Sequence, residues 1–346
     1  MYMYMYMYLN FYMNILFIPM IFITTMMIFS SNSWFSMWMI MEINMLSFIF
    51  ILVFDKFYEN YNSMIYMLIQ SFNSYIFLFG SMNIYFLNLN LINLFYLFMN
   101  LSLLTKLGMS PFFFWYPKIM KNMNWINFMI LSTIQKIIPL YIMNLLMKLL
   151  NNFMIKLNLF NCLIFMFTIN LIALNNINLR LMMCFSSMMH LNWILMLMYI
   201  DENMLIFYLN MYYLIIYVII KILNNFNLNS LNDLFMMKFL KKEIYYMFMI
   251  LFISLMSLPP MISFILKWMF FKEMLTVFNF YFLLINILMS LTFMMIYMRM
   301  LMPMILMNNM IMKINFKLYL SIINMKIYYY YLLLLFNLMY FITELI

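Results

Sequence analysis

The segment "LFYLFMNLSLLTKLGMSPFFFW", Leu94 to Trp115, decides the predicted fold class. It begins as an apolar run, carries one charge at Lys106, and then reaches Gly108 and Pro111. About 20 apolar residues cross the roughly 30 Å hydrocarbon core of a bilayer as a helix. Proline removes a backbone donor inside a helix. The segment therefore predicts a membrane-spanning helix that is interrupted beside a buried lysine.

The composition of the whole chain agrees with this prediction. Of the 346 residues, 69% are hydrophobic and 8% are charged, whereas a soluble domain carries about 25% charged residues. An all-α polytopic membrane protein is predicted. With only Gly80 and Gly108 as glycines, the chain cannot build a glycine-rich phosphate loop or dinucleotide fingerprint. Cys162 and Cys184 lie in apolar segments without metal-ligand spacing, so no cofactor or metal is expected in this chain.

The residue bias indicates the genome that encodes the chain. Met, Ile, Leu, Phe, Asn, Tyr and Lys are abundant, and their codons are AT-rich; alanine occurs once, at Ala173. The 52 methionines would follow if the codon ATA is read as methionine, as in many mitochondrial codes. We therefore expect an AT-rich mitochondrial gene. Methionine replaces leucine at little packing cost, so single methionines indicate no metal or redox role.

Hydropathy predicts a single membrane domain over residues 1–346 with about 11 spanning helices. The predicted spans are residues 8–30, 34–54, 61–80, 91–120, 124–147, 157–174, 180–200, 203–223, 244–272, 276–300 and 326–344.

The distribution of Lys and Arg predicts the orientation, because these residues concentrate on one side of a membrane. The links after even-numbered spans hold ten of them and the links after odd-numbered spans hold three. The amino terminus is predicted to face the positive side, which is the matrix in a mitochondrion, and the carboxyl terminus the intermembrane space. The ten are Lys56, Lys118, Lys121, Arg180, Lys238, Lys241, Lys242, Arg299, Lys313 and Lys317; the three are Lys148, Lys156 and Lys272.

Four ionisable residues fall well inside predicted spans: Glu42, Lys106, Lys136 and Lys267. A charge at the bilayer centre costs roughly 2.5–3.5 kcal/mol on insertion scales, so these residues are candidates for charge transfer. Two structural alternatives stay open. Lys267 lies near enough to the end of its span to reach the headgroups, and Glu42 and Lys106 could form a buried structural ion pair.

His190 is the only histidine, so a metal site with a second histidine ligand is impossible. A hydrogen-bonded structural role and a proton-relay role both remain open for it. Ser186 and Ser187, one turn earlier, could supply hydrogen-bond partners on the same helix face.

Two spans are interrupted in the same way. "KLGMSP" contains Gly108 and Pro111, and "SLPP" contains Pro259 and Pro260. Backbone groups freed inside a membrane must be buried in protein or meet water, so a hydrated, protein-lined pocket is predicted beside the lysines. Paired broken helices are typical of inverted-repeat transporters. We predict two five-helix repeats, residues 8–147 and 157–300, each with its fourth span broken, and a final helix over 326–344.

Five blocks together resemble the signature blocks of the NADH dehydrogenase subunit 2 family of mitochondrial respiratory complex I. In chain order they are "SNSWFSMWMIMEINMLSFI", "LLTKLGMSPFFFWYPKIM", "INFMILSTIQKIIPL", "LRLMMCFSSMMHLNWIL" and "LMSLPPMISFILKW". The resemblance implies an antiporter-like subunit of the membrane arm. It implies proton translocation by a key acid Glu42, its partner Lys106, a central Lys136 and an exit-side Lys267.

The resemblance also implies partners, and the chain differs from the family pattern at several positions. FMN, iron–sulfur clusters and ubiquinone are expected on partner subunits, among other membrane-arm and accessory subunits and membrane lipids, and no nucleic-acid partner is expected. The family's usual histidine is Phe113 here, a usual lysine is Ile65, and the two glycines of "GLPPxxGFxPKW" are lost in "SLPPMISFILKW". A stand-alone cation/proton antiporter and a purely structural scaffold remain alternatives.

Overall fold

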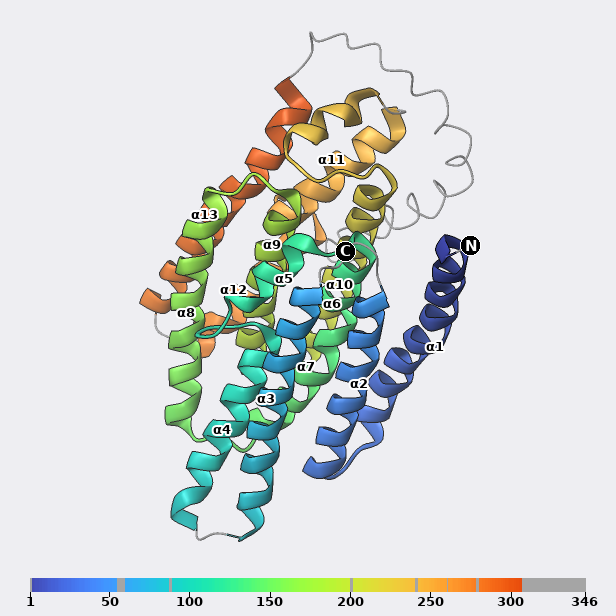
Figure 1. Cartoon of the computed structure of the whole chain (residues 1–346). Helices are drawn as coiled ribbons and strands as arrows, with labels where there is room; N and C mark the ends of the chain where they lie inside the picture. Colours follow the sequence, from blue (N-terminus) through green and yellow to red (C-terminus); the bar gives the residue numbers. More distant parts are fainter. Residues whose placement is uncertain are drawn as a thin grey trace. The chain divides into compact units, whose positions relative to one another are not determined.

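The computed structural model describes residues 2–54, 60–86, 89–199, 202–239, 242–259, 261–277 and 280–306. These residues form long helices, with the single β-bridge of the described part between Asn178 and Ser230 (Figure 1). The helices are α1 (Tyr2–Ser30), α2 (Trp34–Phe54), α3 (Asn60–Phe86), α4 (Leu89–Leu107), α5 (Trp115–Asn122), α6 (Trp125–Ser132), α7 (Ile134–Met147), α8 (Asn152–Leu174), α9 (Leu179–Leu197), α10 (Glu202–Asn225), the 3₁₀ helix η1 (Asn232–Phe239), α11 (Lys242–Met256), α12 (Ile262–Val277) and α13 (Phe280–Leu306).

The all-α membrane architecture predicted from composition is confirmed. Five segments of the described chain are long and apolar enough to cross a membrane: Trp34–Phe54, Trp125–Met147, Asn152–Leu174, Glu202–Asn225 and Phe280–Ile305. Large apolar side chains such as Met26 and Phe72 are exposed on the helix surfaces, where lipid can cover them. The predicted final helix over 326–344 lies outside the described residues, so the count of about 11 spans stays a prediction.

Both predicted interruptions are present. α4 ends at Leu107 and α5 begins only at Trp115, while α11 ends at Met256 and α12 begins at Ile262. Pro260 lies outside the described residues. The first residue after each helix has a left-handed backbone conformation, with φ of +74° at Gly108 and +56° at Ser257. This conformation is the usual helix C-cap and suits glycine best.

The predicted span over 124–147 is present as the apolar segment Trp125–Met147, with a third interruption inside it that was not predicted. The span divides at Thr133 into α6 and α7. Pro139 explains the position, because a proline inside a helix removes the hydrogen bond to the carbonyl four residues earlier and clashes with it. That carbonyl belongs to Gln135, next to the division. Thr133 donates through its hydroxyl to the Met129 carbonyl at 2.7 Å.

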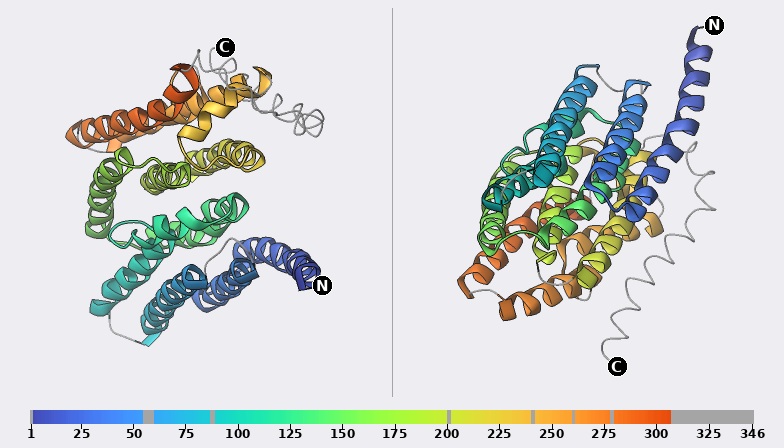
Figure 2. Two further views of the ribbon diagram at one scale, coloured as in Figure 1. Left: turned by 45° about the horizontal axis from the view of Figure 1, so that its top comes forward. Right: turned by 90° about the horizontal axis from the view of Figure 1, so that it is seen from below.

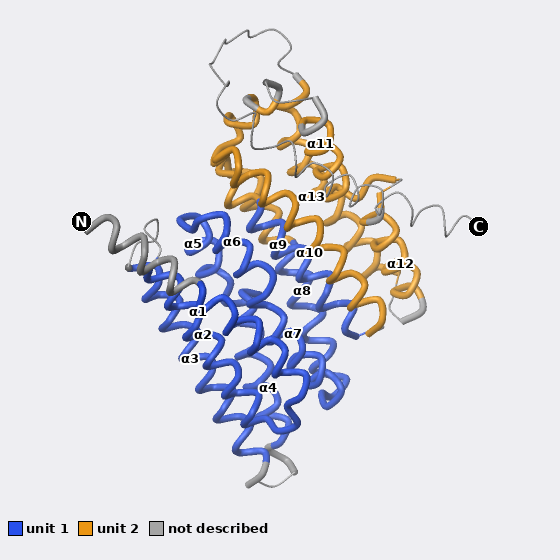
Figure 3. The backbone as a smooth tube through the Cα atoms, turned by 90° about the vertical axis from the view of Figure 1, so that its right-hand side faces the viewer, with its two compact units in different colours: residues 1–166, 183–199 blue, residues 167–182, 200–346 orange. Residues whose placement is uncertain are grey.

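The chain divides into two compact units, and α8 and α9 each contribute residues to both (Figure 3). Unit 1 comprises residues 1–166 and 183–199, and unit 2 comprises residues 167–182 and 200–346. The two predicted repeats do not coincide with these units, and the repeat boundaries stay a prediction.

In unit 1, α1 to α4 pack side by side in chain order, and α7 packs against α1, α2 and α4 (Figure 2). Gly80 permits the close approach of α3 to α4, because a Cβ there would lie 2.7 Å from Met99 Cγ. α7 is thus an inner helix with neighbours on several sides. Its first turn carries Lys136.

In unit 2, α11 packs against α10, α12 and α13. Arg299 of α13 donates to the backbone carbonyls of Leu174 and Asn176 at the end of α8. Carbonyls at a helix C-terminus lack helical partners, so this guanidinium caps α8. Asn170 of the same helix donates to Thr292 Oγ1 at 2.7 Å.

Candidate functional site

Lys106 and Lys136, predicted as separate relay residues, line one and the same cavity of about 30 Å³ in unit 1. A cavity of about 10–15 Å³ by this measure holds a water molecule if polar partners surround it, so there is room for one or two waters. Its other polar lining residues come from α2, α3, α5 and α7. They are Asn44, Tyr66, Gln70, Tyr116 and Gln135.

The end of α4 holds Lys106 in place. The N–H of Met109 donates to the Leu104 carbonyl at 2.9 Å, and the N–H of Gly108 donates to the Thr105 carbonyl at 3.1 Å. These two bonds and the left-handed Gly108 constitute a Schellman C-cap. Lys106 therefore lies in the last helical turn, where the negative end of the helix dipole contributes about 0.3–1 kcal/mol to a nearby cation.

Glu42 and Lys106 interact electrostatically, but no direct hydrogen bond joins them in the described part of the chain. The Lys106 ammonium lies 3.6 Å from the sulfur of Met41, which is a weak acceptor. Glu42 Oε1 is buried and has no hydrogen-bond partner among the described residues. Glu42 and Lys106 are thus neighbours that do not form a direct hydrogen-bonded ion pair in this structure.

Lys136 lies three residues beyond the division at Thr133, in the first turn of α7. Its side chain is only 3% exposed, and its ammonium has no hydrogen-bond partner in the described part of the chain. A cation near a helix N-terminus is disfavoured by about 0.3–1 kcal/mol. A buried ammonium without hydrogen bonds carries a desolvation cost of several kcal/mol, so water in the cavity is the group that can stabilise it.

Tyr116 is the functional candidate that sequence reasoning missed. The Lys136 ammonium lies 4.2 Å from the centre of its ring, and the Tyr116 hydroxyl is 3.1 Å from Ser187 Oγ on α9. A desolvated cation–π contact contributes about 2 kcal/mol, which exceeds the opposing helix dipole. The signal in the sequence was weak, because an aromatic residue after a helix break is also an ordinary packing residue.

Two amides join the helices that carry the candidate residues. Asn44 Nδ2 donates to Gln135 Oε1 at 3.0 Å, and Gln135 Nε2 donates to Asn44 Oδ1 at 3.3 Å. Asn44 is two residues from Glu42, and Gln135 precedes Lys136. The reciprocal pair therefore fixes α2 against α7 beside the cavity. Both amides stand within apolar spans at positions adjacent to the predicted residues, which was the available signal.

The other predicted residues are placed as follows. His190 is buried in α9 of unit 1, and the hydroxyls of Ser186 and Ser187 donate to the carbonyls of Met183 and Cys184. Lys267 lies in α12 of unit 2 and is partly buried. The structure thus brings Glu42, Lys106 and Lys136 together, while the roles of His190 and Lys267 stay predictions.

The chain matches the family described as the membrane domain of the NADH:quinone oxidoreductases and Mrp antiporters over residues 31–295. It is 38% identical over 293 residues to the NADH-ubiquinone oxidoreductase chain 2 of Aedes aegypti, covering 83% of this chain and 84% of that protein. It is 32% identical over 292 residues to the protein of the same name from Anopheles gambiae, with the same coverage of both chains.

Solved structures share the fold at low sequence identity. A chain of respiratory complex I from Thermus thermophilus superposes with a TM-score of 0.75 at 17% identity, over 83% of this chain and 69% of that chain. A chain of the Mrp complex from Dietzia gives a TM-score of 0.73 at 12% identity, over 83% of this chain and 59% of that chain. These likenesses concern the fold alone.

Proposed function

This chain belongs to the NADH-ubiquinone oxidoreductase chain 2 family, and we propose that it is a proton-translocating subunit of the membrane arm of respiratory complex I. The observation that carries the proposal is the single cavity that Lys106 and Lys136 line together. The oxidation of NADH by ubiquinone would take place on partner subunits.

The proposed mechanism is proton exchange between the two lysines through cavity water. Lys106 would hold a proton while Glu42 is close, since opposite charges attract strongly in a medium of low dielectric constant. If Glu42 moved away, that attraction would be lost and the proton would pass through water to Lys136. Moving one charge against the membrane field requires about 2.3 kcal/mol per 100 mV. This energy would come from redox-driven changes in neighbouring subunits.

We assign roles in the route to the two remaining predicted residues. Lys267 would load or release protons at the far side, and His190 would act as a relay. The bias of Lys and Arg between the links supports an amino terminus in the matrix and a carboxyl terminus in the intermembrane space of the mitochondrial inner membrane. Membrane-arm subunits and lipids would cover the exposed apolar faces.

The proposal is tested with Lys136→Met in the assembled complex, reconstituted into vesicles. We expect the number of protons pumped per electron to fall by the whole contribution of this subunit, because methionine keeps the length of the side chain but cannot carry a proton. Lys148→Met is the matched control, since Lys148 is exposed at the end of the same helix. An unchanged ratio in Lys136→Met with normal assembly would refute the proposal and favour a scaffold.

The fold shared with an Mrp chain keeps a stand-alone cation/proton antiporter as a second candidate. The described cavity does not favour it, because its lining contains two lysines and no carboxylate, a poor site for a bare cation. The purified chain in vesicles separates the two functions. An antiporter would exchange Na⁺ or K⁺ for H⁺ on its own, whereas a complex I subunit would not.

A further inference from the structure

Two buried polar atoms on α2 have complementary hydrogen-bonding roles. The indole Nε1 of Trp38 can only donate, and Oε1 of an ionised Glu42 can only accept. Both atoms are shielded from solvent, and neither has a hydrogen-bond partner among the described residues. A buried polar atom without a partner is uncommon in a native structure and calls for an explanation.

The two side chains lie on the same face of α2, one helical turn apart. Residues four positions apart in a helix are neighbours, with about 5–6 Å between their Cβ atoms. Helical side chains lean toward the N-terminus of their helix, which directs Glu42 toward the turn that carries Trp38. The indole ring packs against the Phe35 ring, with 5.6 Å between the ring centres. Rotation about the side-chain bonds of Glu42 can therefore bring its carboxylate to the indole N–H.

The backbone of α2 is fixed close to Glu42. Asn44, two residues further on, forms the reciprocal amide pair with Gln135 of α7. Thr24 of α1 donates through its hydroxyl to Asn44 Oδ1 at 3.3 Å, so one asparagine joins three helices. A change in the distance between Glu42 and Lys106 therefore comes from rotation of side chains and not from displacement of α2.

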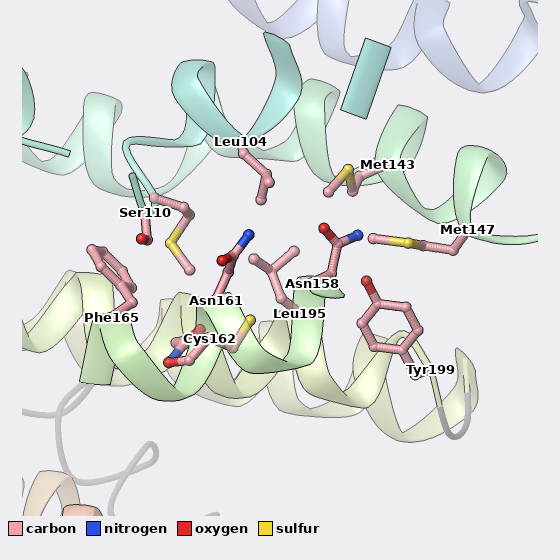
Figure 4. A pocket seen from close by; sticks show the side chains of 12 residues that line it. Leu104, Ser110, Met143, Met147, Asn158, Asn161, Cys162, Phe165, Leu195 and Tyr199 are labelled. Carbon is pink, nitrogen blue, oxygen red and sulfur yellow. The ribbon is translucent and has the colours of Figure 1, made fainter. Parts of the chain in front are cut away.

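Neither of two cavities in unit 1 offers Glu42 another donor. One is the cavity of the two lysines, and the other is a smaller cavity of about 10 Å³ beside the break after α4 (Figure 4). Glu42 lines neither of them in the described chain. The nearby amides of Asn44 and Gln135 are bonded to each other. The indole N–H of Trp38 thus remains as a buried donor within one turn of Glu42.

An indole N–H can hold a carboxylate without taking part in proton transfer. It donates one hydrogen bond, accepts none and carries no charge, so a carboxylate bonded to it stays ionised. A hydrogen bond to a charged group changes the ratio of two conformations by about tenfold or more. Such a bond offsets part of the attraction between Glu42 and Lys106.

We propose that Trp38 is a positioning residue for Glu42. Its N–H donates to the carboxylate in the conformation in which Glu42 has left Lys106. The bond keeps Glu42 there while the proton of Lys106 passes to Lys136. This inference rests on the proposed function, which requires Glu42 to move, and it adds the group that receives Glu42 after the movement.

The test uses two substitutions of Trp38 in the assembled complex, reconstituted into vesicles. Trp38→Phe keeps an aromatic ring without an N–H, whereas Trp38→Gln loses the ring but has an amide N–H that can reach a side chain four residues on. We expect Trp38→Phe to lower the protons pumped per electron toward the value of Glu42→Gln, because Glu42 would then remain with Lys106. Trp38→Gln should pump more protons per electron than Trp38→Phe, even if less complex assembles.

Trp34→Phe is the matched control. Trp34 lies two turns before Glu42 on α2, too far for a direct bond, and its ring contacts the Phe77 ring with 6.3 Å between centres. The same exchange of indole for phenyl should leave the number of protons pumped per electron unchanged there. A fall equal to that of Trp38→Phe would show that the loss of any indole from α2 impairs pumping, and would overturn the inference.

Cryo-EM of the complex during turnover shows the bond directly. We expect one class of particles in which Trp38 Nε1 lies about 2.7–3.2 Å from a Glu42 oxygen and Lys106 lies farther away. The inference is overturned if Glu42 stays beside Lys106 in every class, or if Trp38→Gln pumps no more than Trp38→Phe, as expected for a residue that only packs. Full pumping by Glu42→Gln would instead overturn the proposed function, so the two failures are distinguishable.

Discussion

The ammonium group of Lys136 lies 4.2 Å from the centre of the Tyr116 ring and makes no hydrogen bond within the described chain. Tyr116 follows the interruption of α4, and Lys136 follows the division between α6 and α7. Two helix breaks therefore meet at this contact. A single aromatic face holds the charge while leaving the ammonium hydrogens available to cavity water.

The ring of Tyr116, rather than its hydroxyl, should matter for pumping. Tyr116→Leu removes a contact of about 2 kcal/mol, so we expect a clear fall in protons pumped per electron. Tyr116→Phe keeps the ring and should pump almost normally. Ser187→Ala, which removes the other partner of the hydroxyl bond, should resemble Tyr116→Phe. If Phe and Leu were equally impaired, the hydroxyl and not the ring would be the important group.

The reciprocal amide pair should appear as an energetic coupling between α2 and α7. Asn44→Leu leaves the partly buried Gln135 amide without its partner, which costs up to about 1–3 kcal/mol. The double variant with Gln135→Leu should be less destabilised than the two single effects added together. The temperature at which half of the NADH:ubiquinone activity is lost, measured for all four combinations, gives the coupling. Simple additivity would show that the pair contributes nothing.

Replacing Gly108 by any other residue should lower both the stability of the protein and the number of protons pumped per electron. Its φ is +74°, and a Cβ would lie 3.0 Å from Tyr116 Cβ. A non-glycine residue in such a conformation costs about 1–3 kcal/mol, and the clash would push Tyr116 away from Lys136. Gly108→Ala should therefore lower both the thermal inactivation temperature and the pumped protons per electron. A variant of normal stability and normal ratio would show that the break is not held by this cap.

Ser257→Gly should stabilise the protein, in contrast to Gly108→Ala. Ser257 occupies the equivalent position after α11 at a φ of +56°, where a side chain costs about 1–2 kcal/mol. Glycine removes this cost, but its greater conformational freedom in the unfolded chain destabilises the folded state by about 0.4–1 kcal/mol. We expect a net stabilisation of about 0.5–1 kcal/mol, read as a higher inactivation temperature. No change or a decrease would indicate that the serine hydroxyl compensates for the backbone.

Sequence reasoning predicted much of the fold because the lipid environment imposes simple patterns. The family resemblance is confirmed by the relatives at 32–38% identity, and the breaks at Gly108 and in "SLPP" are confirmed by the helix ends. The two glycines remaining in a glycine-poor chain both lie where a Cβ would be crowded. Composition alone could not show this.

The details of the site could not be predicted for physical reasons. The division at Thr133 was missed although Pro139 signals it, because prolines are often accommodated in membrane helices without a break. The contact of Tyr116 with Lys136 joins residues from two different spans, and no periodicity along one helix reveals such a contact.

The central claim is that Lys106 and Lys136 act in series in one water-filled cavity. The most direct measurement is the number of protons pumped per electron in Lys106→Met, Lys136→Met and the double variant, each in the assembled complex. A single route predicts that all three lose the same amount, because either substitution alone interrupts it. Partial losses in the single variants that add up in the double variant would contradict the account.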